Sequence, residues 1–220
     1  MDALADMSVA PDPLSRPAGP AAARKPRTKP AAVRLDELMA AAQALFVEKG
    51  VEATTINDIV ERAGVAKGTF YHYFTSKNDM LAALRAKFSQ GFLDHIAQAV
   101  DACAPDDGVA RLRAWTRAGV EAYFGGYALH DVVFHDTHHP DRGVAEKSAV
   151  LEQLEGILEA GARAGCWPMD DAALAAIVLY HGMHGAVDAR IAQGRLDARE
   201  LSGPLSETFL RALGARGLTD

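Results

Sequence analysis

Residues 54–74 read TTINDIVERAGVAKGTFYHYF, and this stretch decides the fold. Thr55 occupies an N-cap position, and Asp58 three residues later completes a capping box. Gly64 then follows the last apolar residue, where a left-handed backbone ends many helices. The apolar residues of this first half recur at the spacing of one helix face: Ile56, Ile59, Val60 and Ala63. The pattern predicts a short helix followed by a tight turn.

A second short helix is predicted to begin at Lys67, with Phe70 and Phe74 on its buried side. Its opposite side carries polar and aromatic groups without a carboxylate, which suits contacts with phosphates and base edges. A helix-turn-helix lays its second helix in the major groove in this way, whereas an aromatic helix packed inside a bundle is the alternative. The residues expected to contact DNA are Thr54, Thr55, Lys67, Gly68, Thr69, Tyr71, His72, Tyr73 and, just beyond, Lys77.

A longer ordered pattern surrounds this helix pair. A preceding helix ends at Gly50, and the following motifs are Thr54–Thr55, Ala63–Gly64–Val65, Lys67–Gly68–Thr69, Tyr71–His72–Tyr73–Phe74 and Ser76–Lys77. With these motifs, residues 33–84 resemble the DNA-binding domain of the TetR family of bacterial transcriptional regulators. The resemblance implies a repressor that binds a palindromic DNA operator as a dimer and is released by a small-molecule effector. It also implies that the last two helices form the homodimer interface, with plain core packing within one chain as the alternative.

The charge of the chain is unevenly distributed. The formal net charge of the 220 residues is −6, yet six basic residues and no acid lie between Pro13 and Leu35. The local field decides attraction to DNA, because screening limits its range to about 10 Å. Residues 1–30 are Ala- and Pro-rich and are expected to be disordered. Their basic cluster is expected to contact DNA, with a solvated tail as the alternative: Arg24, Lys25, Arg27 and Lys29.

The remaining sequence predicts helices only. These run from about Ala32 to Lys49, from a Ser76 cap to about Val100, and from Asp106 or Asp107 to Gly125–Gly126, with a short segment over 127–139. Further helices are expected over 143–164, after an Asp170 cap, and over 198–213. No alternating β-branched run or Asn-Gly turn is present. The predicted fold is all-α, with an arm (1–30), a DNA-binding domain (31–78) and an effector-binding and dimerisation domain (79–220).

The C-terminal half is predicted to contain a mixed apolar and polar ligand pocket. Aromatic side chains and an adaptable methionine would form its walls, and histidines would orient the ligand. The sequence leaves open which aromatics line the pocket and which belong to the core. The candidate residues are Trp115, Tyr123, Phe124, Tyr127, Phe134, His135, His139, His181, Met183 and His184.

Two histidine clusters leave a metal-sensing regulator of the same fold as the alternative function. His130, His135, His138 and His139 form one cluster and His181 and His184 the other, and aspartates lie near both. No HExxH motif fixes a ligand set, so no metal or cofactor is assigned. A nucleophile elbow and a Gly-rich phosphate loop are also missing from the sequence, and we therefore expect no enzymatic activity.

The sequence favours a cytoplasmic protein. No apolar run approaches the roughly 18 residues that a membrane span needs. The N-terminus lacks the basic and then apolar order of a signal peptide. Cys103 and Cys166 are far apart in sequence and form no CxxC motif, so both are expected to be reduced thiols.

Overall fold

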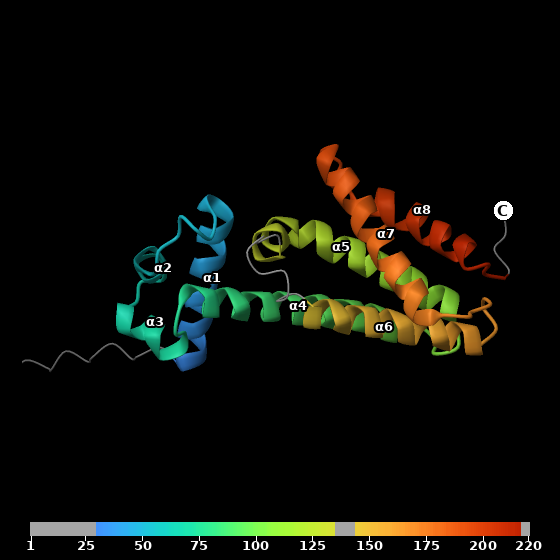
Figure 1. Ribbon diagram of the computed structural model, residues 1–220, viewed down its shortest axis with the longest axis horizontal. Helices are drawn as coiled ribbons and strands as arrows, with labels where there is room; N and C mark the ends of the chain where they lie inside the picture. The colour runs from blue at the N-terminus through green and yellow to red at the C-terminus, as the bar shows by residue number, and fades with distance from the viewer. Residues whose placement is uncertain (1–29, 135–143, 217–220) are drawn as a thin grey trace, which may run out of the picture.

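The prediction of an all-α fold is confirmed by a computed structural model, which describes residues 30–134 and 144–216. For residues 133, 134 and 144–148 it describes the backbone alone. Within these ranges the chain forms eight α-helices and no strand (Figure 1). The helices are α1 (Ala31–Lys49), α2 (Ile56–Ala63), α3 (Lys67–Tyr73), α4 (Lys77–Asp101), α5 (Gly108–Phe134), α6 (Val144–Arg163), α7 (Ala172–Ala192) and α8 (Ala198–Ala212).

The ends of α2 are fixed by the residues that the sequence indicated. The Asp58 backbone N–H donates to the Thr55 hydroxyl at 3.2 Å, and the Thr55 N–H donates to the Asp58 carboxylate at 2.8 Å. Gly64 ends the helix in the left-handed region with a φ of 65°. The reciprocal capping box and the glycine together set where α2 begins and where the turn toward α3 starts.

The first three helices and the start of α4 enclose one hydrophobic core at one end of the molecule (Figure 1). Phe46 from α1, Ile59 from α2 and Phe70 from α3 are fully buried in it. Met80, Leu81 and Leu84 complete this core from α4. The short helices α2 and α3 are therefore held by packing, since helices of this length are marginal in isolation.

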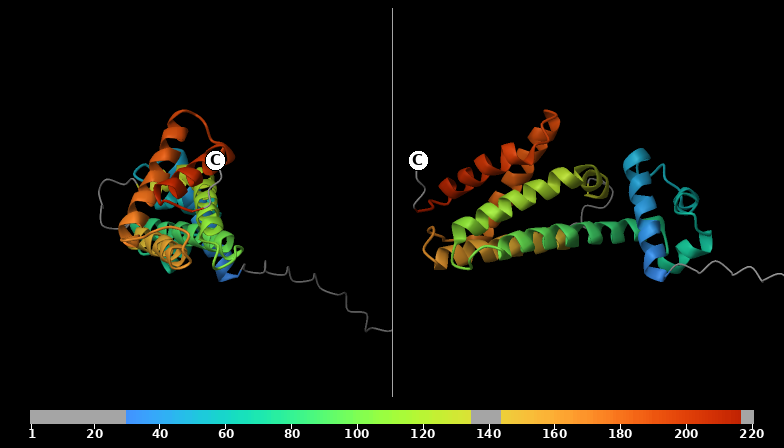
Figure 2. Two further views of the ribbon diagram at one scale, coloured as in Figure 1. Left: turned by 90° about the vertical axis from the view of Figure 1, so that its right-hand side faces the viewer. Right: turned by 180° about the vertical axis from the view of Figure 1, so that it is seen from behind.

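A second and larger core lies among α4, α5, α6, α7 and α8. Figure 2 shows α7 and α8 on one side of α5, with α4 and α6 running side by side on the other. Trp115 of α5, Leu154 of α6 and Met183 of α7 have no exposed surface. Because most of the apolar side chains of this half point inward, the second core is an independent unit of packing.

Two helices connect the cores. The 25-residue helix α4 contributes Leu84 to the first core and Ile96 to the second. Helix α5 is the second connection, because Leu129 and Val132 near its end pack against the first core. Any change in how α4 and α5 lie in the second core is thereby transmitted to α1–α3.

Several local expectations need correction. Helix α5 continues through Gly125 and Gly126 to Phe134, where the sequence predicted an end. Gly126 is required there by packing, because a Cβ at this position would lie 2.7 Å from the Phe88 ring. The N-cap of α7 is Asp171 and not Asp170, since the Asp171 carboxylate accepts from the Leu174 N–H at 2.8 Å. In the described ranges, no helix combines the length and apolar character that a membrane span requires.

The capping box predicts an acid-sensitive helix-turn-helix. Hydrogen bonds from Lys49 and from the Thr55 backbone lower the pKa of Asp58 from 3.8 to about 2. Because the folded-state pKa lies below the unfolded one, the stabilisation is complete above about pH 4 and is lost as the pH falls toward 2. Urea unfolding measured across this range should show an acid-dependent decrease that Asp58→Asn reduces. An unchanged pH profile in the variant would contradict this role of Asp58.

Candidate nucleic-acid interface and effector domain

Helix α3 presents a polar and aromatic surface to solvent. Lys67, Gly68, Tyr71 and His72 are exposed, and Thr69 is half-buried. Phe70 fixes the helix from beneath as a fully buried anchor, and the Tyr71 ring meets it edge-on at 5.5 Å. The seven residues of α3 contain no acid. A surface of hydroxyl, imidazole and ammonium groups without a carboxylate suits a polyanion.

The scaffold behind α3 is held by two ion pairs between α1 and α2. The Arg62 guanidinium donates two hydrogen bonds of 2.7 Å to the Glu48 carboxylate, which is the bidentate arrangement. These bonds lower the pKa of Glu48 and raise that of Arg62. Lys49 donates to Asp58 at 2.7 Å. The carboxylates of Glu48 and Asp58 are thus each paired with a base of the same domain.

Thr54, predicted to contact DNA, instead has a structural role. Only 1% of its surface is exposed. Its hydroxyl lies 2.7 Å from the Gly50 carbonyl oxygen and donates to it, which ties the end of α1 to the start of α2. Thr55 remains exposed, and its hydroxyl oxygen accepts the N–H of Asp58. The Thr55 side chain also hydrogen-bonds to the Asp58 carboxylate and helps to lower its pKa.

Lys77 and Tyr73 also differ from the prediction. The Lys77 ammonium donates to the carbonyl oxygens of Val51, Glu52 and Thr54 at 2.6, 3.4 and 3.0 Å. An ammonium has three protons, so these bonds leave none for a phosphate. The Tyr73 hydroxyl donates to the Ala31 carbonyl oxygen at 2.9 Å and holds α3 against the start of α1. The basic arm of Arg24, Lys25, Arg27 and Lys29 lies outside the described residues.

In the C-terminal half, the structure brings a set of tyrosine and histidine side chains together. The Tyr123 hydroxyl donates to the Asp188 carboxylate at 2.9 Å. The Tyr123 ring lies 4.6 Å from the His130 ring and 4.8 Å from the His184 ring. Tyr180, which the sequence analysis missed, lies 4.1 Å from His184. Tyr123 on α5 and Asp188 on α7 are 65 residues apart in sequence, so only the packing of the two helices reveals the cluster.

Burial governs the ionisation of the two tyrosines in this cluster. It raises the pKa of Tyr123, and the hydrogen bond to Asp188 raises it further. Burial also raises the pKa of Tyr180 to about 12. Both phenols are therefore neutral hydrogen-bond donors at physiological pH.

The other predicted pocket residues fall into three groups. Trp115, Phe124 and Met183 are buried side chains of the core, with Phe124 retaining 8% of its surface. Tyr127 and His181 are exposed on α5 and α7. The side chains of Phe134, His135 and His139 lie outside the described residues.

The histidines do not form a metal site in the part of the chain that the structure describes. There, no group of three or more His, Cys, Asp or Glu side chains is arranged to hold a metal ion. His184 Nδ1 lies 3.0 Å from the Tyr180 carbonyl oxygen, an ordinary helical contact. His135, His138 and His139, on which the metal-sensing alternative depends, lie outside the described residues.

Three buried polar atoms of the C-terminal half lack a hydrogen-bond partner within the described chain. They are Arg111 Nε and Trp115 Nε1 on α5, and Gln153 Oε1 on α6. A buried polar group without a partner costs about 1–3 kcal/mol. Such atoms are retained where a ligand or water satisfies them, and a ligand-binding domain is one such setting.

Comparison with known proteins agrees with this geometry. The profile of the family described as "Bacterial regulatory proteins, tetR family" matches residues 38–84. The HTH-type transcriptional repressor KstR2 of Rhodococcus jostii is 30% identical over 147 residues, which cover 62% of this chain and 69% of that protein. KstR2 of Mycobacterium tuberculosis is 44% identical over 61 residues, and the match spans only 28% of its length.

The fold of most of the chain also resembles that of solved structures. FadR of Bacillus subtilis, solved in complex with stearoyl-CoA, superimposes with a TM-score of 0.70 at 21% identity. That match covers 80% of this chain and 97% of FadR. The chain belongs to the TetR family of bacterial regulatory proteins and is a DNA-binding transcriptional regulator with a helix-turn-helix.

The hydrogen bonds of Lys77 predict that this residue stabilises the fold and does not contact a DNA phosphate. Lys77→Met should lower the free energy of unfolding by about 1.5–3 kcal/mol, because hydrogen bonds from a charged donor are lost. The salt dependence of DNA binding should stay unchanged. In the control variant Lys67→Met, the slope of log K against log salt should decrease by about 0.9, as for one lost phosphate contact. Urea unfolding and fluorescence anisotropy measure the two effects, and a reduced slope in Lys77→Met would contradict this assignment.

Proposed function

We propose that this chain is a cytoplasmic homodimeric repressor that binds a palindromic operator and releases it when a small molecule binds the C-terminal half. Residues 1–30 serve as a basic DNA-contacting arm, 31–78 as the DNA-binding domain, and 79–220 as the effector and dimerisation domain. The KstR2 relatives are repressors by name, which supports repression over activation. The proposal includes no catalytic step.

The observation that carries the proposal is the acid-free outer surface of α3. It is formed by Lys67, Gly68, Thr69, Tyr71 and His72, with Thr55 at the adjacent end of α2. Because Phe70 and the Tyr73 hydroxyl anchor α3 from below, these side chains keep a fixed orientation. Such an arrangement reads base edges in the major groove while neighbouring groups hold phosphates.

An exposed apolar stripe on α7 supports dimerisation. Leu174, Ile177 and Val178 are 57%, 43% and 60% exposed, while Leu179 and Met183 of the same helix face the core. A helix that is apolar on both sides is stable in water only when a partner covers its outer side. A two-fold dimer through α7 and α8 would also present two recognition helices to the two halves of a palindrome.

The packing supports control of DNA binding by an effector. The three unsatisfied polar atoms lie in the half that also holds the tyrosine–histidine cluster. Both α4 and the end of α5 extend from this half to the DNA-binding core. An effector can shift the operator equilibrium only as far as its affinities for the two conformations differ. Since FadR binds stearoyl-CoA, acyl-CoA thioesters are the first class of effector to test.

Operator binding by α3 can be tested once a duplex has been selected with the wild-type protein from random DNA. Thr69→Ala and His72→Ala should each weaken binding to that duplex about tenfold or more, because a base contact is worth about 1–3 kcal/mol. The melting temperature should stay near that of the wild type. Glu152→Ala, at an exposed position of α6 outside the proposed dimer interface, is the control. Unchanged affinity in both α3 variants would exclude α3 as the recognition helix.

Dimerisation through α7 can be tested with a buried charge. Val178→Asp should convert the dimer to a monomer in light scattering after gel filtration, because an unpaired carboxylate in an apolar interface is strongly unfavourable. Affinity for the selected duplex should fall in parallel. Val47→Asp is the control, since Val47 of α1 is 43% exposed and lies outside the proposed interface. A dimer that persists in Val178→Asp would place the interface elsewhere.

A further inference from the structure

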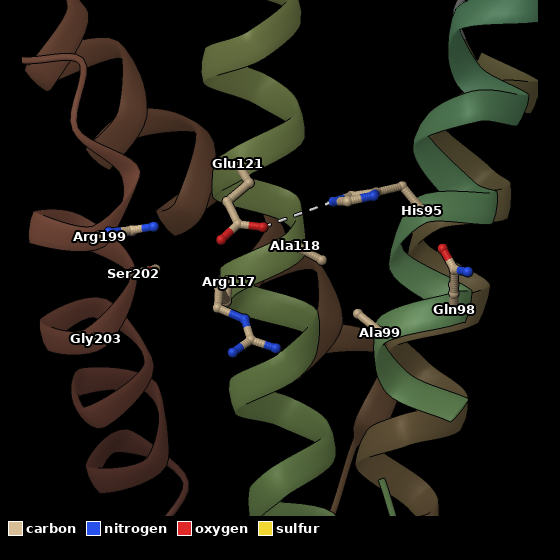
Figure 3. A pocket seen from close by; sticks show the side chains of 9 residues that line it. All are labelled: His95, Gln98, Ala99, Arg117, Ala118, Glu121, Arg199, Ser202 and Gly203. Atoms are coloured by element: carbon tan, nitrogen blue, oxygen red, sulfur yellow. Dashed lines mark ion pairs between the residues drawn. The ribbon is translucent and has the colours of Figure 1, made fainter. Parts of the chain in front are cut away.

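A groove runs between α4, α5 and α8. Its first section has a volume of about 610 Å³ and is lined by residues of all three helices, with Arg117 of α5 and Arg199 of α8 among them (Figure 3). A second section of about 490 Å³ continues between α4 and α5. The sections share His95 and Glu121, so they meet at this pair. Both volumes fall in the range of small-molecule sites, about 300–1,000 Å³.

The first section carries uncompensated positive charge. Arg117 and Arg199 form no ion pair with any residue in the described parts of the chain. The Glu121 carboxylate, the acid in this section, is oriented toward His95, 3.9 Å from its Nε2 (Figure 3). The guanidinium groups of Arg117 and Arg199, which belong to different helices, therefore face the same section of the groove. The Glu121 carboxylate lies where this section joins the second one. Guanidinium groups bind phosphate and carboxylate groups through paired hydrogen bonds.

The second section has an apolar floor. Phe88 and Phe92 of α4 are half-buried and line it. Gly91 of α4 and Gly125 of α5 also line it, and a Cβ at either position would meet nothing within 4 Å. The missing side chains leave open space above the aromatic rings. A slender hydrocarbon chain buries apolar area in such a channel.

We propose that this groove binds an amphipathic organic anion, with its phosphate or carboxylate head at Arg117 and Arg199 and its apolar chain along Phe88 and Phe92. The inference rests on the proposed function in one respect, since the anion would be the effector. No residue of α7 lines the groove, whereas α8, the other helix of the proposed dimer interface, contributes Arg199, Ser202 and Gly203 to it. Each section alone would be ordinary solvated surface. A cationic section that continues into an apolar one matches a molecule with an anionic head and an apolar chain.

The groove is also well placed to affect the DNA-binding half. Phe88 contacts His130 with a ring separation of 5.8 Å, and its ring packs on the backbone of Gly126. The apolar section therefore lies where Phe88 of α4 packs against α5. A chain inserted there changes the spacing of the two helices that connect the cores.

Binding can be tested by isothermal titration calorimetry on the full-length protein with four probes. Decanoyl-CoA has a phosphate-bearing head and a chain, and coenzyme A has the same head without the chain. Decanoate has a carboxylate head and a chain, and decyl maltoside has a chain with an uncharged head. Decanoyl-CoA or decanoate should bind, and the better of the two identifies the head group. Coenzyme A should bind more weakly for lack of a chain, and decyl maltoside for lack of an anion. Equal binding of decyl maltoside, or no binding of either chain-bearing anion, would overturn the proposal.

Variants locate the site. Arg117→Gln and Arg199→Gln are exposed substitutions and should each weaken the chain-bearing anion about tenfold to a hundredfold, the value of a charge-assisted hydrogen bond. Gly125→Leu should fill the apolar section and abolish binding.

The controls are Arg163→Gln and Gly156→Leu, at two exposed positions of α6 outside the groove. A Cβ at Gly156 also meets open space. Circular dichroism melting verifies that each variant folds. Wild-type affinity in both arginine variants would overturn the proposal.

The failure of this inference and that of the proposed function give different results. If the anion binds the groove but does not release the selected duplex in anisotropy experiments, the site stands and effector control by this groove fails. If the anion releases the duplex equally from the wild type and from Gly125→Leu, the regulator stands and the groove assignment fails.

Discussion

The structure depends on the continuity of α4, which belongs to two hydrophobic cores at once. Leu84 is buried among α1–α3, and Ile96 is buried among α5–α8. Twelve residues separate them, which corresponds to about 18 Å along a helix axis. An unbroken helix transmits displacement over such a distance with little bending. The two halves of the molecule therefore cannot move independently, although each buries its own apolar side chains.

Helix α5 provides the second connection, because it also contributes side chains to both cores. Its start lies in the large core with Leu112, and Leu129 near its end reaches the DNA-binding core. The glycine at 126 permits α5 to lie against Phe88 of α4. Two helices that touch at this point and end on the same small core act together on α1–α3. In the function that we propose, a change in their spacing reorients α3, as a regulator with two conformations requires.

Polar residues of the helix-turn-helix divide into those that build the domain and those that face outward. Thr54, Tyr73 and Lys77 satisfy backbone carbonyl oxygens, and their side chains are occupied by these bonds. Thr69 and His72 hold no such contact with the scaffold in the described structure and remain available to a partner. The domain therefore keeps its shape with one set of donors and leaves another set facing solvent.

The sequence alone determined the features that depend on residues within one or two helical turns. Thr55, Asp58 and Gly64 set the ends of α2, and the spacing of apolar residues gave helices throughout, because local backbone hydrogen bonds and side-chain periodicity follow from neighbouring residues. The family motif between Thr54 and Lys77 also identified the DNA-binding half.

Tertiary structure decided the features that join distant segments. That Lys77 binds the carbonyl oxygens of the loop before α2, that Tyr180 joins Tyr123, and that Arg117 and Arg199 face one groove all depend on how helices pack. Helix packing places residues from remote parts of the chain side by side, and a single sequence carries no local signal of which residues these are.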